Sequence, residues 1–332
     1  MQKFLVIQTA FIGDAVLATG ILEKLHKQYP NATIDFLVRK GNENLFIDHP
    51  FLNTVLVWDK QNSKYKNLLK LIFQIRKYRY DVVINVQRFA ATGLLTVLSN
   101  AKLTIGYNKN PFSFLYNVKI SHQLDLENTP LHEIERNQLL IESIAPGLAE
   151  KPKLYPSKTD EEFITNFSKN TYITIAPASV WFTKQFPAQQ WLKLIKAIPQ
   201  HITIYLLGGK TDYELCNSLV VCSKVNNIEN LSGKLNFLQS AALMKYAKMN
   251  YVNDSAPMHF ASAVNAPICA VYCSTIPAFG FGPLSDNSCI VEVEEKLNCR
   301  PCGLHGKSDC PEGHFNCANE IKTAQLLQYL NL

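Results

Sequence analysis

Residues 3–28 of the chain read KFLVIQTAFIGDAVLATGILEKLHKQ and decide its fold class. Residues 3–8 are rich in β-forming residues and wholly apolar at their centre, which predicts a buried strand of a parallel sheet. Residues 14–28 carry apolar side chains at helical spacing, so a helix is expected after a short polar turn. A buried strand, a turn and an amphipathic helix in this order predict a doubly wound α/β domain.

The same alternation continues through the rest of the chain. Further strands of the first part are predicted at residues 33–38, 54–57, 81–86 and 103–105. The pattern starts again after a polar segment with two prolines, residues 151–158. Strands of the second part are predicted at residues 172–176, 202–207, 251–253 and 268–272, and helices at residues 189–198, 212–222, 237–248 and 257–264. We therefore expect two Rossmann-like domains, residues 1–155 and 156–332.

Composition limits the class of protein. The 332 residues are 47% hydrophobic and 18% charged, which excludes a disordered or coiled-coil chain. Residues 4–20 are apolar but are interrupted by Asp14, so no export signal is predicted. The uncharged residues 260–285 contain prolines and glycines that break a membrane helix. We expect a soluble cytoplasmic protein whose nine cysteines are reduced or bound to metal.

The turn after the first strand carries Asp14 in the sequence TAFIGD, residues 9–14. In doubly wound folds ligands bind at the carboxyl ends of the strands, and Gly13 lets a substrate approach the backbone closely. Asp14 is therefore a candidate general base, with a carboxylate that caps the following helix as the alternative. The turn lacks the pattern GxGxxG, so a dinucleotide site is not predicted.

Two turns of the second part carry residues suited to a diphosphate. The loop APASVWFTKQFP, residues 176–187, offers the hydroxyl of Ser179 and the ammonium of Lys184, although a solvated surface lysine is the alternative. Gly208 and Gly209 form a second strand-to-helix turn, which is a weak signal by itself.

The stretch NDSAPMH, residues 253–259, predicts the start of another helix. Asp254 or Ser255 can cap this helix, which Pro257 begins. Free N–H groups at such a helix start favour phosphate. His259 lies about one turn into the helix, where it either reaches the same anion or packs on the helix face.

Residues 60–80 contain seven basic residues and no acid. The basic residues are Lys60, Lys64, Lys66, Lys70, Arg76, Lys77 and Arg79. They suit an anionic membrane surface or a phosphorylated glycolipid acceptor, with the solvated face of an ordinary amphipathic helix as the alternative. Nucleic acid is not expected, because no recognition motif accompanies the basic residues.

A cysteine-rich segment, residues 299–317, lies near the end of the chain. Its four thiols belong to Cys299, Cys302, Cys310 and Cys317. Four thiolates can hold a structural zinc ion, but their spacing departs from the usual paired C-x2-C pattern. Reduced packed thiols or an oxidised pair are the alternatives.

Four motifs in order, TAFIGD, YDVVINVQRFAATGLL from Tyr80, PASVWFTKQFP and NDSAPMH, together resemble the ADP-heptose:lipopolysaccharide heptosyltransferases, glycosyltransferase family 9. The resemblance covers nearly the whole chain, including the CRPC motif at residues 299–302. It implies the GT-B fold, in which two Rossmann-like domains face an interdomain cleft. The first domain then binds the acceptor and the second binds the nucleotide sugar.

The resemblance also implies a reaction and three roles. A heptose is transferred with inversion from ADP-heptose to a hydroxyl of the lipopolysaccharide inner core, and no divalent ion is required. Asp14 matches the catalytic base of the family, Lys184 its phosphate-contacting lysine and Ser179 its hydroxyl donor.

The helix-start motif of the family matches Asp254, Ser255 and Ala256, followed by His259. Ala256 stands where the family usually has glycine, and its Cβ limits how closely a diphosphate approaches. The ribose-contacting acid of the family has no clear equivalent, and Asp212 is only a candidate.

The partners implied are a nucleotide-sugar donor, an anionic glycolipid acceptor and the cytoplasmic surface of the inner membrane, to which the enzyme would bind peripherally. The nearest alternative is the same fold with another nucleotide sugar. A nicotinamide-dependent oxidoreductase should show a glycine fingerprint and an acid about 20 residues beyond it, and neither is evident. A zinc-dependent module that binds nucleic acid ranks last.

Overall fold

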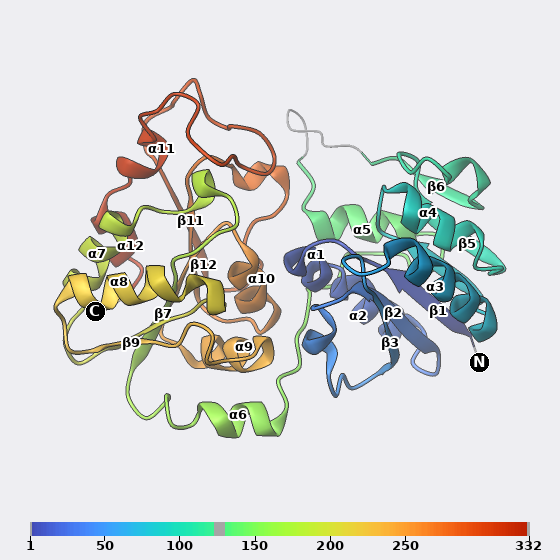
Figure 1. Cartoon of the computed structure of the whole chain (residues 1–332), viewed down its shortest axis with the longest axis horizontal. Coiled ribbons are helices and arrows are strands. Elements are labelled where there is room, and N and C mark those ends of the chain that lie inside the picture. The colour runs from blue at the N-terminus through green and yellow to red at the C-terminus, as the bar shows by residue number, and fades with distance from the viewer. Residues whose placement is uncertain (1, 123–129, 331–332) are drawn as a thin grey trace. The chain divides into compact units, whose positions relative to one another are not determined.

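The computed structural model describes residues 2–122 and 130–330, and the chain divides into two compact units, Met1–Tyr155 and Pro156–Leu332. Each unit holds one six-stranded sheet with helices packed on it (Figure 1). All neighbouring strands run parallel. The predicted fold class, two doubly wound α/β units, is therefore confirmed.

The sheet of the first unit has the strand order β3-β2-β1-β4-β5-β6. Its strands are β1 (Lys3–Ile7), β2 (Thr33–Arg39), β3 (Leu52–Trp58), β4 (Val82–Asn85), β5 (Leu103–Tyr107) and β6 (Val118–Ile120). β1 is central, and its residues 4–7 are completely buried, which explains their continuous apolar run. The strand order reverses between β1 and β4, and doubly wound sheets bind ligands at such a switch point.

The helices of the first unit cover both faces of this sheet. They are α1 (Ile12–Leu17), α2 (Thr19–Gln28), α3 (Lys64–Tyr78), α4 (Ala90–Val97) and α5 (Glu133–Ile141), with one-turn helices at Glu43–Phe46 and Ser113–Leu115. α2 packs beside α5, and α3 packs beside α4 (Figure 1). The two pairs of helices thus enclose the core of the unit.

The single helix predicted at residues 14–28 is in fact divided, so that part of the prediction is wrong. The hydroxyl of Thr19 donates a hydrogen bond of 2.7 Å to the carbonyl of Val16 at the break. The chain before the unit boundary also packs closely here, because a Cβ on Gly20 would lie 2.6 Å from the carbonyl oxygen of Glu150. This contact joins segments far apart in sequence, so helical periodicity could not indicate it.

The second unit repeats the architecture with the strand order β12-β11-β10-β7-β8-β9. Its strands are β7 (Tyr172–Ala176), β8 (Thr203–Leu206), β9 (Ile228–Asn230), β10 (Asn250–Asn253), β11 (Ile268–Tyr272) and β12 (Ser288–Glu292). Its helices are α6 (Lys158–Ile164), α7 (Ala188–Ala197), α8 (Tyr213–Ser223), α9 (Phe237–Tyr246), α10 (Ala256–Ala263), α11 (Asn316–Asn319) and α12 (Thr323–Leu327). One-turn helices lie at Phe182–Lys184, Lys210–Asp212 and Pro277–Phe279.

Here the strand order reverses between β7 and β10. The loops that follow these two neighbouring parallel strands therefore emerge at the same edge of the sheet. On one side of this sheet α7 packs beside α8 and α12, and on the other α9 packs beside α6 and α10. Among the residues described, no helix is long and apolar enough to cross a membrane.

Candidate active site

The structure places Asp14 at the switch point of the first unit. It is partly buried in the first turn of α1, directly after β1. Phe11 occupies the N-cap position of this helix, and its side chain makes no capping hydrogen bond. The alternative that Asp14 is the N-cap residue is therefore wrong. The carboxylate instead lies at the edge of the sheet where a doubly wound fold binds its ligand.

Side chains from neighbouring elements hold the turn between β1 and α1. The hydroxyl of Thr9 donates to Oε1 of Gln87, which follows β4, at 3.0 Å. The N–H of Ala10 donates to Oε1 of Gln8 at 3.1 Å, and the ammonium of Lys60 donates to the carbonyl of Thr9 at 2.6 Å. The position of Asp14 is thus fixed from both strands of the switch point.

Lys60 differs from the other basic residues of the predicted set. Its Nζ lies 4.7 Å from the ring centroid of Trp58. Burial lowers the pKa of Lys60 to about 8, with further contributions from the charges of Arg39 and Lys64. Lys60 therefore supports the Asp14 turn, whereas the remaining six residues are exposed on α3 or, for Arg79, directly after it.

A buried ion pair also influences the region of Asp14. Nε of Arg136 donates to Oε2 of Glu133 at 3.0 Å, and a second guanidinium nitrogen lies 2.9 Å from the same oxygen. Burial raises the pKa of Glu133, Arg136 lowers it, and the charge of Asp14 raises it further. Neither Glu133 nor Arg136 was predicted as a site residue from the sequence.

In the second unit, Lys184 and Asp254 come together at the switch point. Nζ of Lys184, from the loop after β7, lies 2.6 Å from Oδ2 of Asp254, which follows β10. The side chains are 15% and 7% exposed. The hydroxyl of Thr275, after β11, donates to the same oxygen at 2.7 Å. Lys184 is thus a mostly buried, paired cation, and the alternative of a solvated surface lysine is wrong.

Asn253 fixes the loop that carries Lys184. Its side chain is completely buried, and its Nδ2 donates to the carbonyl of Pro177 at 2.9 Å. Its Oδ1 accepts from the N–H of Phe186 at 2.9 Å, so one amide holds both ends of the loop. The sequence offers one signal for this role, because Asn253 is an amide at the end of a buried strand, but the role of Asn253 was not predicted.

The middle of the cysteine-rich segment supports the same loop. The hydroxyl of Thr183 accepts from the hydroxyl of Ser274 at 2.9 Å and from the N–H of Lys307 at 2.8 Å. Gly306, with φ +78°, lies so close that a Cβ there would be 3.0 Å from Cγ of Lys184. The segment therefore packs directly on the Lys184 loop.

Arg300 ties this segment to the end of β11. Its Nε donates to the carbonyl of Cys273 at 2.7 Å. One terminal nitrogen donates to the carbonyl of Thr275 at 2.7 Å and to the carboxylate of Glu292 at 2.6 Å. Arg300 thus holds the residue that hydrogen-bonds Asp254, a role that sequence analysis did not predict.

The other predicted donor-site residues surround these loops. Ser179 is half-buried, and its N–H lies 3.4 Å from Oε1 of Gln185. α10 begins at Ala256, one residue before Pro257, with Ser255 as N-cap; this side chain makes no capping bond. His259 is buried in α10.

The glycine turn lies at the end of β8. The carboxylate of Asp212 accepts from the N–H of Gly209 at 2.7 Å and so closes its own turn. A Cβ on Gly208 would lie 2.8 Å from Cβ of Asp212, which explains the glycine. A contact between Asp212 and a ribose stays a prediction.

The cysteine-rich thiols lie near one another. Sγ of Cys299 lies 4.0 Å from Nε2 of His314, and Sγ of Cys302 lies 3.3 Å from the carbonyl of Cys299. Burial raises the pKa of Cys317 to about 12, with a contribution from Cys302. Across residues 2–122 and 130–330, no group of three or more His, Cys, Asp or Glu side chains could hold a metal. The structural zinc stays a prediction.

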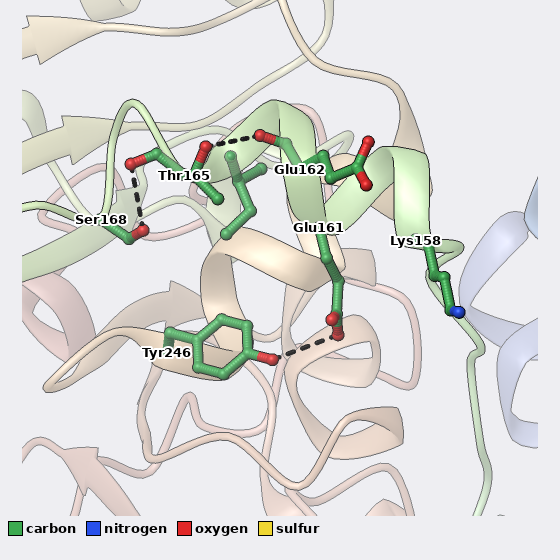
Figure 2. Close-up of a pocket in the computed structure, with 7 residues that line it drawn as sticks. Lys158, Glu161, Glu162, Thr165, Ser168 and Tyr246 are labelled. Atoms are coloured by element: carbon green, nitrogen blue, oxygen red, sulfur yellow. Dashed lines mark hydrogen bonds between the residues drawn. The ribbon is translucent and has the colours of Figure 1, made fainter.

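A surface pocket of the second unit lies between α6 and the end of α9 (Figure 2). Glu161 on its wall accepts from Nζ of Lys245 at 2.8 Å and from the hydroxyl of Tyr246 at 3.2 Å. Lys245 thereby lowers the pKa of Glu161. None of the predicted site residues lines this pocket, and Glu161 is already paired with Lys245, so we assign the pocket no catalytic role.

Comparison with known proteins covers both units. A family model described as Glycosyltransferase family 9 (heptosyltransferase) matches residues 68–309. Lipopolysaccharide heptosyltransferase 2 of Escherichia coli K12 is 24% identical over 352 residues, covering 99% of this chain and 98% of that protein. Lipopolysaccharide heptosyltransferase 3 of the same strain is 26% identical over 290 residues, or 83% of each chain.

Solved structures show the same fold. The Escherichia coli ADP-heptose lps heptosyltransferase II matches with a TM-score of 0.80 and 22% identity, over 99% of this chain and 98% of that one. The glycosyl transferase family 9 protein of Veillonella parvula matches with a TM-score of 0.85 and 19% identity, over 99% and 96%. The fold is therefore shared along the whole chain.

Proposed function

Because the chain belongs to glycosyltransferase family 9, the heptosyltransferases, we propose that it transfers a heptose from ADP-heptose to a hydroxyl of the lipopolysaccharide inner core. The names of its relatives supply the sugar and the acceptor class. The observation that carries the proposal within this chain is the buried pair of Lys184 and Asp254 at the switch point of the second sheet.

The second unit is proposed to bind the donor. The ammonium of Lys184, the hydroxyl of Ser179 and the backbone N–H groups of Ser255 and Ala256 at the start of α10 meet the charge of the diphosphate. Asp254 holds Lys184 in place before the donor arrives, so little rearrangement is needed as charge develops on the leaving group. Gly208, Gly209 and Asp212 lie at the neighbouring strand end and His259 on α10, and these four complete the proposed donor site.

Asp14 of the first unit is proposed as the base. Its carboxylate accepts the proton of the acceptor hydroxyl while that oxygen forms a bond to the anomeric carbon of the heptose. The bond from this carbon to the diphosphate oxygen breaks, its electron pair leaves with ADP, and the configuration inverts. The proposed base and the proposed donor site thus belong to different units.

The step as proposed uses no divalent ion. Lys184 and the N-terminus of α10 supply the positive charge that stabilises the departing ADP. A zinc ion in the cysteine-rich segment would have a structural role only. Metal analysis of the purified protein measures whether the segment holds one.

A lipid-linked anionic acceptor places the reaction at the surface of a membrane. We therefore propose that the enzyme acts as a peripheral protein on the cytoplasmic face of the inner membrane. The exposed basic residues of α3 support this proposal, because anionic lipids attract such clusters.

The donor class is tested by thermal unfolding of the full chain with a panel of nucleotides and nucleotide sugars. A ligand that binds only the native state raises the melting temperature according to its affinity. ADP and ADP-heptose should raise it at lower concentrations than UDP, GDP and their sugars. Stabilisation by a uridine or guanosine nucleotide at lower concentration than any adenosine nucleotide would contradict the proposed donor.

A further inference from the structure

Helix α3 carries apolar residues on two faces instead of one. Its inner face contributes Leu68, Leu71, Ile72 and Ile75 to the core of the first unit. A second set, Tyr65, Leu69 and Phe73, is 75%, 56% and 71% exposed. Single exposed apolar residues are common, but three large ones in register on one helix require an explanation.

The spacing places these three residues side by side. Residues 65, 69 and 73 are four apart, so at about 100° per residue they fall within an arc of about 80°. On the same wheel Lys66, Lys70 and Lys77 occupy the adjoining arc, away from the core face. We call Tyr65, Leu69, Phe73, Lys66, Lys70, Arg76 and Lys77 the outer face of α3.

The charges of the outer face are not neutralised by the protein. α3 itself contains no acidic residue. Within the described part of the chain, none of the four basic side chains of the outer face forms an ion pair with a carboxylate. Lys64, one residue before the outer face, lies with its Nζ 5.7 Å from the ring centroid of Tyr65. The outer face thus combines an apolar stripe with a border of unpaired cations.

We infer that the outer face of α3 docks on an anionic lipid bilayer, with the helix lying in the plane of the interface. Tyr65, Leu69 and Phe73 then enter the boundary between headgroups and acyl chains. The lysines beside them extend to the lipid phosphates. This inference rests on the membrane location given in the proposed function and names the surface of the protein that binds. Vesicle binding can be measured without any turnover of substrate.

Two features favour lipid over nucleic acid as the partner. Leu69 has no aromatic ring on which a base could stack, whereas its burial in the acyl boundary is favourable. Nucleic acid would use the cations and could stack on the rings of Tyr65 and Phe73, but it would leave Leu69 in water. The helix is also preformed, because its inner face is anchored in the core, so docking does not require a segment to fold.

The electrostatic part is tested by co-sedimentation of the full chain with vesicles of phosphatidylglycerol and phosphatidylethanolamine, against neutral phosphatidylcholine vesicles. A triple variant carries Lys66→Gln, Lys70→Gln and Lys77→Gln. It should bind the anionic vesicles about 100-fold more weakly, since each lysine near the surface contributes about 1 kcal/mol. The matched control carries Lys193→Gln, Lys196→Gln and Lys224→Gln, exposed lysines of the second unit, and should bind like wild type.

The apolar part has its own pair of variants. Leu69→Ser with Phe73→Ser should weaken vesicle binding about tenfold or more, because apolar burial contributes to interfacial binding. Leu148→Ser with Val221→Ser, two residues exposed elsewhere at 90% and 66%, should not. Circular dichroism must show that each variant is folded. Turnover of a water-soluble acceptor fragment should stay unchanged in Leu69→Ser with Phe73→Ser, while turnover of a vesicle-embedded acceptor falls.

Three results would overturn the inference. The first is failure of wild type to bind anionic vesicles at low salt, and the second is binding of the outer-face variants equal to that of their controls. The third is tighter binding of a single-stranded RNA than of vesicles, with the same dependence on Lys66, Lys70 and Lys77. Vesicle binding that depends on α3 without any heptosyl transfer would instead uphold the docking surface and contradict the proposed function.

Discussion

The ammonium nitrogen of Lys184 lies 2.6 Å from a carboxylate oxygen of Asp254, and both side chains are largely buried. Thr275 hydrogen-bonds the same oxygen, so loops after three neighbouring strands, β7, β10 and β11, meet at one point. A lysine held in this way cannot swing freely into solvent. Its charge is therefore fixed at the sheet edge where we propose that a diphosphate binds.

Lys184→Ala should weaken ADP binding by about 10-fold to 100-fold, the usual effect of losing a hydrogen bond to a charged group. Adenosine, which has no phosphate, should bind as before. Calorimetry measures both ligands, and Lys193→Ala on the exposed side of α7 is the control. Equal losses for ADP and adenosine would show that Lys184 does not act on the phosphates.

Thr275→Val should raise the KM for the donor by about tenfold, because Asp254 loses a hydrogen bond and no longer fixes Lys184 as firmly. The side chains are nearly equal in size, so the fold should be kept. Thr165→Val, whose hydroxyl bonds a carbonyl in an exposed turn, is the matched control. If donor KM does not change in Thr275→Val, the loops do not depend on this bond.

Asp14→Asn should lower kcat by about 100-fold or more, since an amide cannot accept the acceptor proton. Donor affinity should be preserved, because Asp14 belongs to the other unit. Asp48→Asn, an exposed aspartate with positive φ that Asn tolerates, serves as control. Near-normal turnover in Asp14→Asn would exclude this residue as the base.

We predict that His49 makes the first unit sensitive to acid. Its ring centroid lies 4.6 Å from that of Phe51 and 4.9 Å from that of Tyr155, and neither ring nitrogen has a hydrogen-bond partner among the described residues. Burial and, to a lesser extent, the charge of His26 lower the pKa of His49 to about 4. The unfolded chain binds this proton below about pH 6.5, so stability falls as the pH drops from 6.5 towards 4.

His49→Phe should therefore lose less melting temperature than wild type between pH 7 and pH 5, measured by calorimetry. The phenyl ring keeps the aromatic packing and cannot be protonated. His201→Gln, at an exposed histidine of the second unit, should follow wild type. An unchanged loss of melting temperature in His49→Phe would show that the acid sensitivity has another source.

The fold could be predicted from the sequence because the central strands of both sheets are buried and largely apolar, as in β1. β6 (Val118–Ile120) was missed because three residues with one lysine show no period. The break between α1 and α2 was missed because Gly20 responds to the backbone of Glu150, which is distant in sequence. Local pattern thus predicts elements but not the contacts that interrupt them.

In the site, too, local motifs predicted single residues but not the contacts between them. Lys184 and Asp254 were each chosen from a local motif, but their ion pair joins residues 70 positions apart, 254 minus 184. Asn253, Thr275 and Arg300 act through backbone carbonyls or carboxylates of other loops, so no short motif indicates them. Lys60 was grouped with the basic residues of α3, although its ammonium donates a hydrogen bond to the carbonyl of Thr9 in the turn before Asp14.

The most direct test of the account is the product analysis of one reaction. Purified full-length protein is mixed with ADP-heptose and an inner-core acceptor that lacks the heptose, and both products are followed by chromatography and NMR. The account predicts ADP and heptosylated acceptor in equal amounts, with inverted anomeric configuration. Retention of configuration, or no transfer from ADP-heptose while a uridine-nucleotide sugar is transferred to the same acceptor, would contradict it.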